Sequence, residues 1–301
     1  MVQERNLVDR MADVLIYVIV TLLALVCLIP FFNVIARSFS SAEATNMGIV
    51  KLWPIGFNLD NFGLLMRDAQ FKKSFLISIL RVFLALPLTL FMCAITAYPM
   101  SRDSIRMPGR TFFKVLLIFS MLFSGGLIPV FLTYKMLDLL NRFLVLIIPW
   151  GFDIFYTILL INFFRGIPKE LSESAVLDGA SHFDILFRVF LPLSLPSLAT
   201  IAVFASVAHW NSWFDGVMFL NKTDLWPLQS FLYQRVMQAP TNNLRQNLNT
   251  DMAREALAFR DATGDGMRAA MLVIASIPII LVYPLLQRYF VKGLTLGAVK
   301  G

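Results

Sequence analysis

The sequence is short of the residues that build a soluble surface, a disulfide framework or a metal centre. Charged residues make up 15% of its 301 residues, whereas an average soluble domain is about a quarter charged. The two cysteines, Cys27 and Cys93, both lie inside apolar runs, which excludes a disulfide scaffold. No two His or Cys residues stand at a spacing typical of metal ligands, so we expect no metal site.

Apolar residues are present in excess. They amount to 58% of the chain, with 28 Phe and a mean hydropathy of +0.72. A single globular core of this length does not usually bury so much apolar surface, and disorder requires the opposite composition. The composition therefore predicts an integral membrane protein in contact with lipid. The net charge of +7 is then explained by Lys and Arg at the ends of membrane segments, and we expect no nucleic-acid partner.

Six stretches are apolar over the roughly 20 residues that a membrane helix needs. They lack the period-2 alternation of barrel strands, which favours helices. Their approximate bounds are Ala12–Ala36, Ser74–Tyr98, Thr111–Tyr134, Phe143–Phe164, Leu195–Leu220 and Ala269–Phe290. We predict an all-α integral membrane protein in three parts. Residues 1–73 form an anchor helix (about 12–36) and an outer loop, residues 74–290 form a core with five membrane helices, and residues 291–301 form a tail.

Six spans place both termini on the same side of the membrane. Lys and Arg are nearly balanced between the two faces, so their totals do not orient the chain. Short loops weigh more than long ones in the positive-inside rule, and the short loop at 101–110 with its flank carries Arg102, Arg106, Arg110 and Lys114. This cluster predicts cytoplasmic N- and C-termini and a cytoplasmic tail.

The segment 165–192 combines charges with a helical pattern. Pro168 suits the first turn of a helix, and Glu170 and Glu173 suit its positive end. Apolar or small residues recur at every fourth position as one ridge: Leu171, Ala175, Gly179, Phe183 and Phe187. The Asp178-Gly179 pair predicts a bend between two short helices. The pattern alone leaves open a surface helix that lies on the bilayer with its ridge in the headgroups.

The same segment resembles the EAA loop of ABC importer permeases. That loop reads Glu-Ala-Ala, three residues, Gly, nine residues and Ile-x-Leu-Pro, and this chain has Glu173-Ser174-Ala175, Gly179 and Val189-Phe190-Leu191-Pro192 at the same spacing. Ser174 and Val189 are mild departures from the pattern. Further stretches resemble the oligosaccharide-uptake branch of that family, which includes maltose-type and alginate-type subunits: Phe123–Pro129, His209–Phe214, Trp226–Gln229, Tyr283–Gly293 and Gly297–Gly301.

The resemblance implies a type I ABC importer permease fold of six transmembrane helices in the bacterial cytoplasmic (inner) membrane. Such a chain is a half-transporter that pairs with a second homologous permease, usually as a heterodimer. It docks on a cytoplasmic ATPase dimer and receives an oligosaccharide from an extracytoplasmic substrate-binding protein. By the same resemblance, 165–192 is a cytoplasmic coupling loop with a coupling helix. Its ATPase-coupling residues would be Glu170, Glu173, Ala175, Asp178, Gly179, Ala180, Phe183 and Pro192.

The sequence contains no G-x-x-x-x-G-K-[ST] phosphate-binding loop. We therefore expect a transport subunit that is not an enzyme and holds no cofactor, with ATP and Mg bound by the partner ATPase subunits. A secondary transporter is an alternative, but it would need internal repeats and broken helices around a midplane site. An intramembrane enzyme would need a convergent nucleophile or metal set, which two distant histidines do not supply. A permease for another small solute stays open.

Several polar and aromatic residues lie within the predicted spans. Ionisable groups are costly there and often functional: Arg81, Asp153, His209 and Asp215. One interpretation assigns part of a translocation path to Tyr156, Trp210, Asn211, Trp213 and Asp215. Aromatic faces pack on sugar rings, and amides and carboxylates bind hydroxyl groups. The alternative is structural: a buried ion pair, or an aromatic belt at the headgroups.

The long outer loop 221–268 contains a short amphipathic helix of mixed charge at Asp251–Arg260. By resemblance, this loop would face the binding protein. Asp261–Gly266 lacks the alternating acids of a calcium loop, and we interpret it as a turn. Basic residues on the extracytoplasmic side of the membrane favour an acidic glycan as substrate, whereas the acidic residues on the same side weaken that preference.

Overall fold

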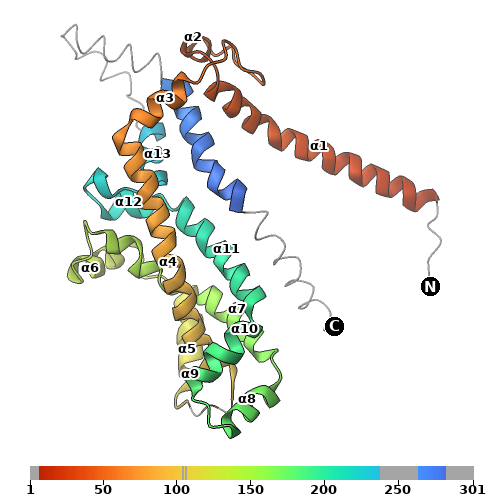
Figure 1. Cartoon of the computed structure of the whole chain (residues 1–301), viewed down its shortest axis with the longest axis vertical. Coiled ribbons are helices and arrows are strands. Elements are labelled where there is room, and N and C mark those ends of the chain that lie inside the picture. Colours follow the sequence, from red (N-terminus) through yellow and green to blue (C-terminus); the bar gives the residue numbers. More distant parts are fainter. Residues whose placement is uncertain (1–6, 104, 106, 238–263, 283–301) are drawn as a thin grey trace. The chain divides into compact units, whose positions relative to one another are not determined.

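A computed structural model describes residues 7–103, 105, 107–237 and 264–282. All regular elements in these ranges are helical (Figure 1). The predicted helix Asp251–Arg260, the C-terminal motifs from Tyr283 onward and the tail 291–301 lie outside the described residues. The predicted turn at Asp261–Gly266 is wrong for its last three residues, because Gly264–Gly266 already begin the helix Gly264–Val282.

The chain divides into two compact units. The first comprises residues 1–69 and 235–276, and the second comprises residues 70–234 and 277–301. In the first unit, α1 (Leu7–Ser38) is followed by α2 (Ala42–Asn46) and α3 (Asp60–Arg67). None of the residues in the most apolar window of α1 is buried. Asn61 of α3 donates its amide to the carbonyls of Ser38 and Ser40, both at 3.1 Å, and so ties α3 to the end of α1.

The second unit contains the remaining elements. They are α4 (Ala69–Ser101), α5 (Arg110–Leu122), α6 (Leu127–Met136), η1 (Phe143–Leu146), η2 (Ile148–Trp150), α7 (Ile154–Arg165), α8 (Lys169–Leu177), α9 (His182–Ile185), η3 (Leu186–Phe190), α10 (Leu191–Leu193), α11 (Leu195–Asn211), α12 (Phe214–Phe219), η4 (Thr223–Leu225) and α13 (Leu228–Met237). The first residue of α4 and the end of α13 belong to the first unit.

The described helices supply four candidate spans without a sharp bend and two bent ones. The former are Arg10–Ser38, Ala69–Ser101, Phe143–Arg165 and Gly264–Val282, of which Phe143–Arg165 comprises η1, η2 and α7. The bent pairs are Arg110–Leu122 with Leu127–Met136, at 116°, and His182–Leu193 with Leu195–Asn211, at 81°. Counting each bent pair as one span gives six, the predicted number, but the second bent pair begins at His182 instead of Leu195 and so includes part of the segment 165–192.

The predicted third span, Thr111–Tyr134, is not one continuous helix. It breaks between α5 and α6, where Phe123 is extended and Gly126 has φ 84°. Residues other than glycine rarely adopt that backbone conformation. The amide of Gly126 donates to Ser124 Oγ at 3.2 Å, which satisfies one backbone group at the break. The chain therefore turns sharply within an apolar stretch that hydropathy alone presents as a single span.

The predicted fifth span, Leu195–Leu220, is also interrupted. It consists of α11 and α12, separated at Ser212-Trp213, where Ser212 has an extended backbone. Two apolar clusters hold the second unit together. One joins the end of α4 to α7, η3 and α11 through residues such as Ala97, Phe164, Phe190 and Ile201. The other joins α4, η1 and α12 through Ile77, Leu146 and Phe219.

Candidate functional site

The segment predicted to be a coupling loop begins directly after α7. α8 starts at Lys169, with Pro168 as the residue just before it, and Glu170 lies in its first turn. Glu170 and Glu173 are both exposed. Negative side chains near the N-terminus of a helix interact favourably with the free amide groups there. The predicted start of this helix is therefore confirmed to within a residue.

The predicted bend at Asp178-Gly179 is present. Gly179 has φ 79°, its amide donates to the Val176 carbonyl at 3.0 Å, and the amide of Ala180 donates to the Ala175 carbonyl at 2.9 Å. These two hydrogen bonds form a Schellman motif, which ends a helix with a glycine in the left-handed region. Any residue other than glycine would cost about 1–2 kcal/mol in that backbone conformation. The proposed ridge is wrong as one continuous helical face, because the helix ends between its second and third residues.

A capping box that the sequence interpretation missed starts the next helix. Ser181 Oγ accepts the amide of Asp184 at 3.2 Å, and the carboxylate of Asp184 accepts the amide of Ser181 at 3.4 Å. The signal is present in the sequence, since a Ser followed three residues later by an acid before an apolar run is typical of a helix start. The chain then continues through a π-helical turn, Leu186–Phe190, to Pro192 in α10.

The inner side of this loop is fixed to the membrane helices. Ile185, Leu186 and Phe190 are buried in the cluster with Phe164 and Ala97, and Ala175 and Ala180 pack against it. The Phe164 and Phe190 rings meet edge to face at 5.2 Å. Tyr98 near the end of α4 forms a hydrogen bond through its hydroxyl to His182 Nδ1 at 3.3 Å. Two membrane helices thus hold the loop rigidly from one side.

Arg102 also attaches the loop to the membrane helices. The sequence pattern places it in the positive cluster of a short loop, but it is buried, with 4% of its surface exposed. Its Nη2 donates to the Ile167 carbonyl at 2.6 Å, and its guanidinium lies 4.9 Å from the centre of the Phe190 ring. Burial lowers the pKa of Arg102 from its ordinary value, without bringing deprotonation near neutral pH. No sequence pattern signals this contact, because 65 residues separate the partners.

Replacing Arg102 with alanine is expected to weaken the attachment of the loop to the membrane helices by a free energy of about 1.5–3 kcal/mol, because the Ile167 carbonyl loses a charged donor. Hydrogen exchange of the backbone amides in residues 169–190 should accelerate accordingly. Arg165→Ala is the matched control, since Arg165 is exposed at the end of α7. Equal exchange in the two variants would show that Arg102 does not hold the loop.

Several apolar side chains of the loop are exposed and do not belong to this buried cluster. The exposed fraction is 88% for Leu177, 62% for Phe183 and 54% for Val176. Leu171 and Phe187 are exposed as well. We call these five residues the outer face of the loop. Of the predicted coupling residues, Ala175 and Ala180 pack against the buried cluster. The others are exposed: Glu170, Glu173, Asp178, Gly179, Phe183 and Pro192.

A second polar cluster lies where the fifth span is interrupted. Arg81 of α4 is fully buried and forms an ion pair with Asp215 of α12, with Nη2 and Oδ2 2.5 Å apart. Ser212 Oγ donates to the same carboxylate oxygen at 2.7 Å. The Trp150 ring lies 5.8 Å from the Arg81 guanidinium and meets His209 edge on. Asp215 therefore belongs to a buried ion pair, as one of the two interpretations predicted; its place on the translocation path stays a prediction.

The other residues of the predicted path differ in their surroundings and exposure. Trp210 is 6% exposed and meets Phe75 edge on, while Trp213 is 40% exposed and stacks on Tyr233 at 4.1 Å. Asn211 is exposed. Tyr156 packs on the cluster at the other end of the unit. Asp153 caps α7 by accepting the amide of Tyr156 at 2.9 Å. Asn211 and Trp213 are thus the path residues whose side chains remain accessible.

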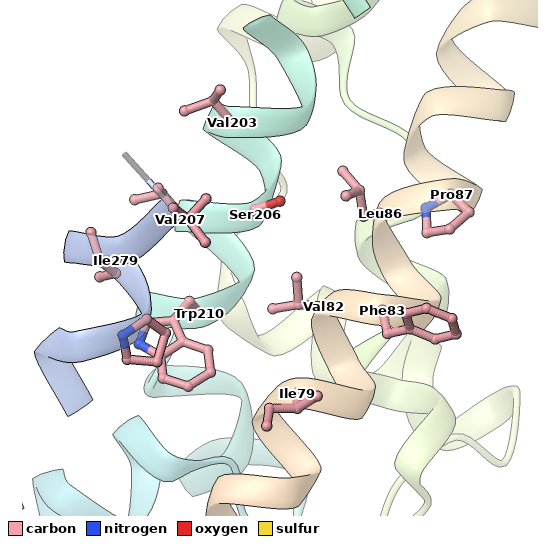
Figure 2. A pocket seen from close by; sticks show the side chains of 12 residues that line it. Ile79, Val82, Phe83, Leu86, Pro87, Val203, Ser206, Val207, Trp210 and Ile279 are labelled. Atoms are coloured by element: carbon pink, nitrogen blue, oxygen red, sulfur yellow. The ribbon is translucent and has the colours of Figure 1, made fainter. Parts of the chain in front are cut away.

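Trp210 also lines an apolar groove between α4 and α11 (Figure 2). The groove has a volume of about 440 Å³. Its walls are aliphatic or aromatic apart from Ser206 and include Ile79, Phe83, Val203 and Ile279. A hydroxyl-rich ligand needs more hydrogen-bonding groups than this groove offers. Within the described ranges, no group of three His, Cys, Asp or Glu residues could hold a metal ion.

Comparison with known proteins places these features in a family. The family described as "Binding-protein-dependent transport system inner membrane component" matches residues 2–296. The polygalacturonan/rhamnogalacturonan transport system permease protein YtcP of Bacillus subtilis (strain 168) is 37% identical over 97% of this chain and 99% of its own length. The arabinooligosaccharides transport system permease protein AraQ of Halalkalibacterium halodurans is 30% identical, with 93% of each chain covered.

A solved structure is similar along nearly the whole chain. It is the crystal structure of a bacterial ABC transporter involved in the import of the acidic polysaccharide alginate. The matching chain is 29% identical, with a TM-score of 0.85, and the alignment covers 95% of this chain and 98% of that one.

Proposed function

The chain belongs to the family of binding-protein-dependent transport system inner membrane components, and on that premise we propose that it is the permease subunit of an ABC importer for oligosaccharides. In this proposal it pairs with a second, homologous permease in the bacterial inner membrane. A cytoplasmic ATPase dimer drives transport, and an extracytoplasmic binding protein delivers the substrate. Both termini are cytoplasmic, and the division into an anchor (1–73), a core (74–290) and a tail (291–301) belongs to the same proposal.

The observation that carries this proposal is the two-sided construction of the loop at 165–192. Its inner side is fixed to α4 and α7 by Arg102, Tyr98 and Phe190, whereas its outer face is apolar and exposed. In this proposal the loop lies outside the membrane, where an exposed apolar patch marks a protein interface. A partner that binds the outer face of the loop can therefore move the attached spans as rigid bodies. An ATPase subunit that closes on nucleotide is such a partner.

For the substrate, we propose oligosaccharides that contain uronate residues. Polygalacturonan is a chain of uronic acids, and the relative that is 37% identical is a permease of a polygalacturonan transport system. Alginate is an acidic polysaccharide, and the similar structure belongs to a transporter involved in its import. The arabinooligosaccharide relative, at 30% identity, is less similar than the polygalacturonan relative and about as similar as the alginate importer chain at 29%. Asn211 and Trp213, both accessible beside the interruption of the fifth span, are the residues we propose for contact with the sugar.

The test is uptake by vesicles that contain this chain co-expressed with the proposed permease, ATPase and binding-protein partners, sought among the products of neighbouring genes. We expect the three membrane-associated components to co-purify, and uptake of a uronate oligosaccharide to require both ATP and the binding protein. A neutral arabinooligosaccharide is the matched substrate. Strict preference for the neutral sugar would contradict the acidic class. Uptake by the purified single chain without ATP would contradict an importer subunit altogether.

A further inference from the structure

The segment after α1, residues 39–58, folds back along that helix, and we call it the return loop. The side-chain amide of Asn33 donates to the carbonyl of Val50 at 3.2 Å and to that of Lys51 at 2.6 Å. Asn33 lies five residues before the end of α1 at Ser38, which is about 8 Å along the helix axis. The return loop therefore folds back beside the last turns of α1 (Figure 1).

Asn33 also marks the end of the hydrocarbon-length part of α1. Residues 14–32 contain no charged or amide side chain, and at 1.5 Å per residue they span about 29 Å. The hydrocarbon core of a bilayer is about 30 Å thick. A hydrocarbon core placed on residues 14–32 puts Asn33 and its two carbonyl partners at the boundary between acyl chains and headgroups.

The return loop is well ordered by its own hydrogen bonds, yet much of its surface is apolar. Ser41 donates its amide to the Ile55 carbonyl at 3.0 Å, and Val50 is buried with Ala36 and Ala44. Nevertheless, six apolar side chains are exposed: Met47, Ile49, Leu52, Trp53, Ile55 and Phe57. Trp53 has 82% of its surface exposed, three residues beyond the carbonyl that Asn33 binds first.

We propose that the return loop is an interfacial anchor that inserts Trp53 and its apolar neighbours into the phospholipid headgroup region. The leaflet is the one at the C-terminal end of α1. We take phospholipid as the occupant because the patch continues the exposed apolar surface of α1, a helix long and apolar enough to cross a membrane, beside Asn33. The composition agrees, since Trp and Lys are enriched at membrane interfaces and Lys51 and Glu43 are the only charged residues of the loop. Such an anchor fixes the depth of α1 in the bilayer.

The experiment measures depth in the complete importer, reconstituted in phosphatidylcholine–phosphatidylglycerol nanodiscs. A nitroxide is attached at Trp53→Cys in a background with Cys27→Ala and Cys93→Ala. Collisions with oxygen, which concentrates in lipid, are compared with collisions with Ni–EDDA, which stays in water. The lipid reference is a nitroxide on native Cys27, exposed in α1. The water reference is Asp60→Cys, exposed in the first turn of α3.

We expect the oxygen-to-nickel collision ratio at Trp53 to be several-fold higher than at Asp60 and lower than at Cys27. Nickel access equal to that at Asp60 would overturn the proposal. Protection from both reagents would also overturn it, because protein would then cover the site. An unlabelled measurement gives a second check: Trp53→Phe should remove part of the tryptophan fluorescence that brominated lipids quench, and unchanged quenching would contradict insertion.

Discussion

Arg81→Ala is expected to destabilise the second unit by about 3–5 kcal/mol, the usual cost of breaking a buried ion pair by removing one partner. Without Arg81, the Asp215 carboxylate stays buried with the Ser212 hydroxyl as its described hydrogen-bond donor. The interruption between α11 and α12 then loses its attachment to α4. The measurement is the free energy of unfolding in mixed micelles, by titration with a denaturing detergent.

Two controls separate the ion pair from a general effect of mutation on α4. Lys73→Ala removes an exposed pair with Asp224, at 2.8 Å, which also joins α4 to the segment after the fifth span; exposed pairs contribute about 0–1 kcal/mol. The double variant Arg81→Met with Asp215→Leu should recover most of the loss, since apolar replacement of both partners is often neutral. A cost for Arg81→Ala no larger than that for Lys73→Ala would contradict the assignment.

The membrane class and the six spans could be predicted from sequence because each span needs only length and hydropathy. Where a span breaks could not be predicted in the same way. Phe123 and Leu127 are as apolar as the residues on either side, so the turn at Gly126 leaves no trace in a hydropathy average. Only the Gly125-Gly126 pair signals it, through the backbone conformation that glycine permits.

The candidate site divides along a similar line. Local features have local signals in the sequence: the start at Pro168, the bend at Gly179 and the capping box of Ser181. Long-range contacts do not, because nothing in a single sequence pairs Arg81 with Asp215 across 134 residues or Arg102 with Ile167 across 65. The bend also decides which residues face outward, so Leu177 and Val176, absent from the predicted coupling set, are among the exposed apolar ones.

Leu177→Glu, made together with Phe183→Glu, is expected to weaken ATPase docking by about 30-fold or more. These residues are 88% and 62% exposed on the outer face of the loop. Each would bury against the ATPase in our proposal. A glutamate at such a position buries an unpaired charge, and loss of one interface hot spot costs about 2 kcal/mol or more, which corresponds to about 30-fold in affinity. The measurement is binding of the purified ATPase to the reconstituted permease pair.

Met136→Glu is the matched control, because Met136 is 87% exposed but ends α6, in another part of the second unit. It should bind the ATPase as the unmodified chain does, since a charge there leaves the outer face of the loop unchanged. Transport provides the second measurement: the variant with both loop substitutions should lose uptake while the permease pair stays assembled. Normal ATPase affinity in that variant would show that the coupling surface lies elsewhere and that the outer face has another partner.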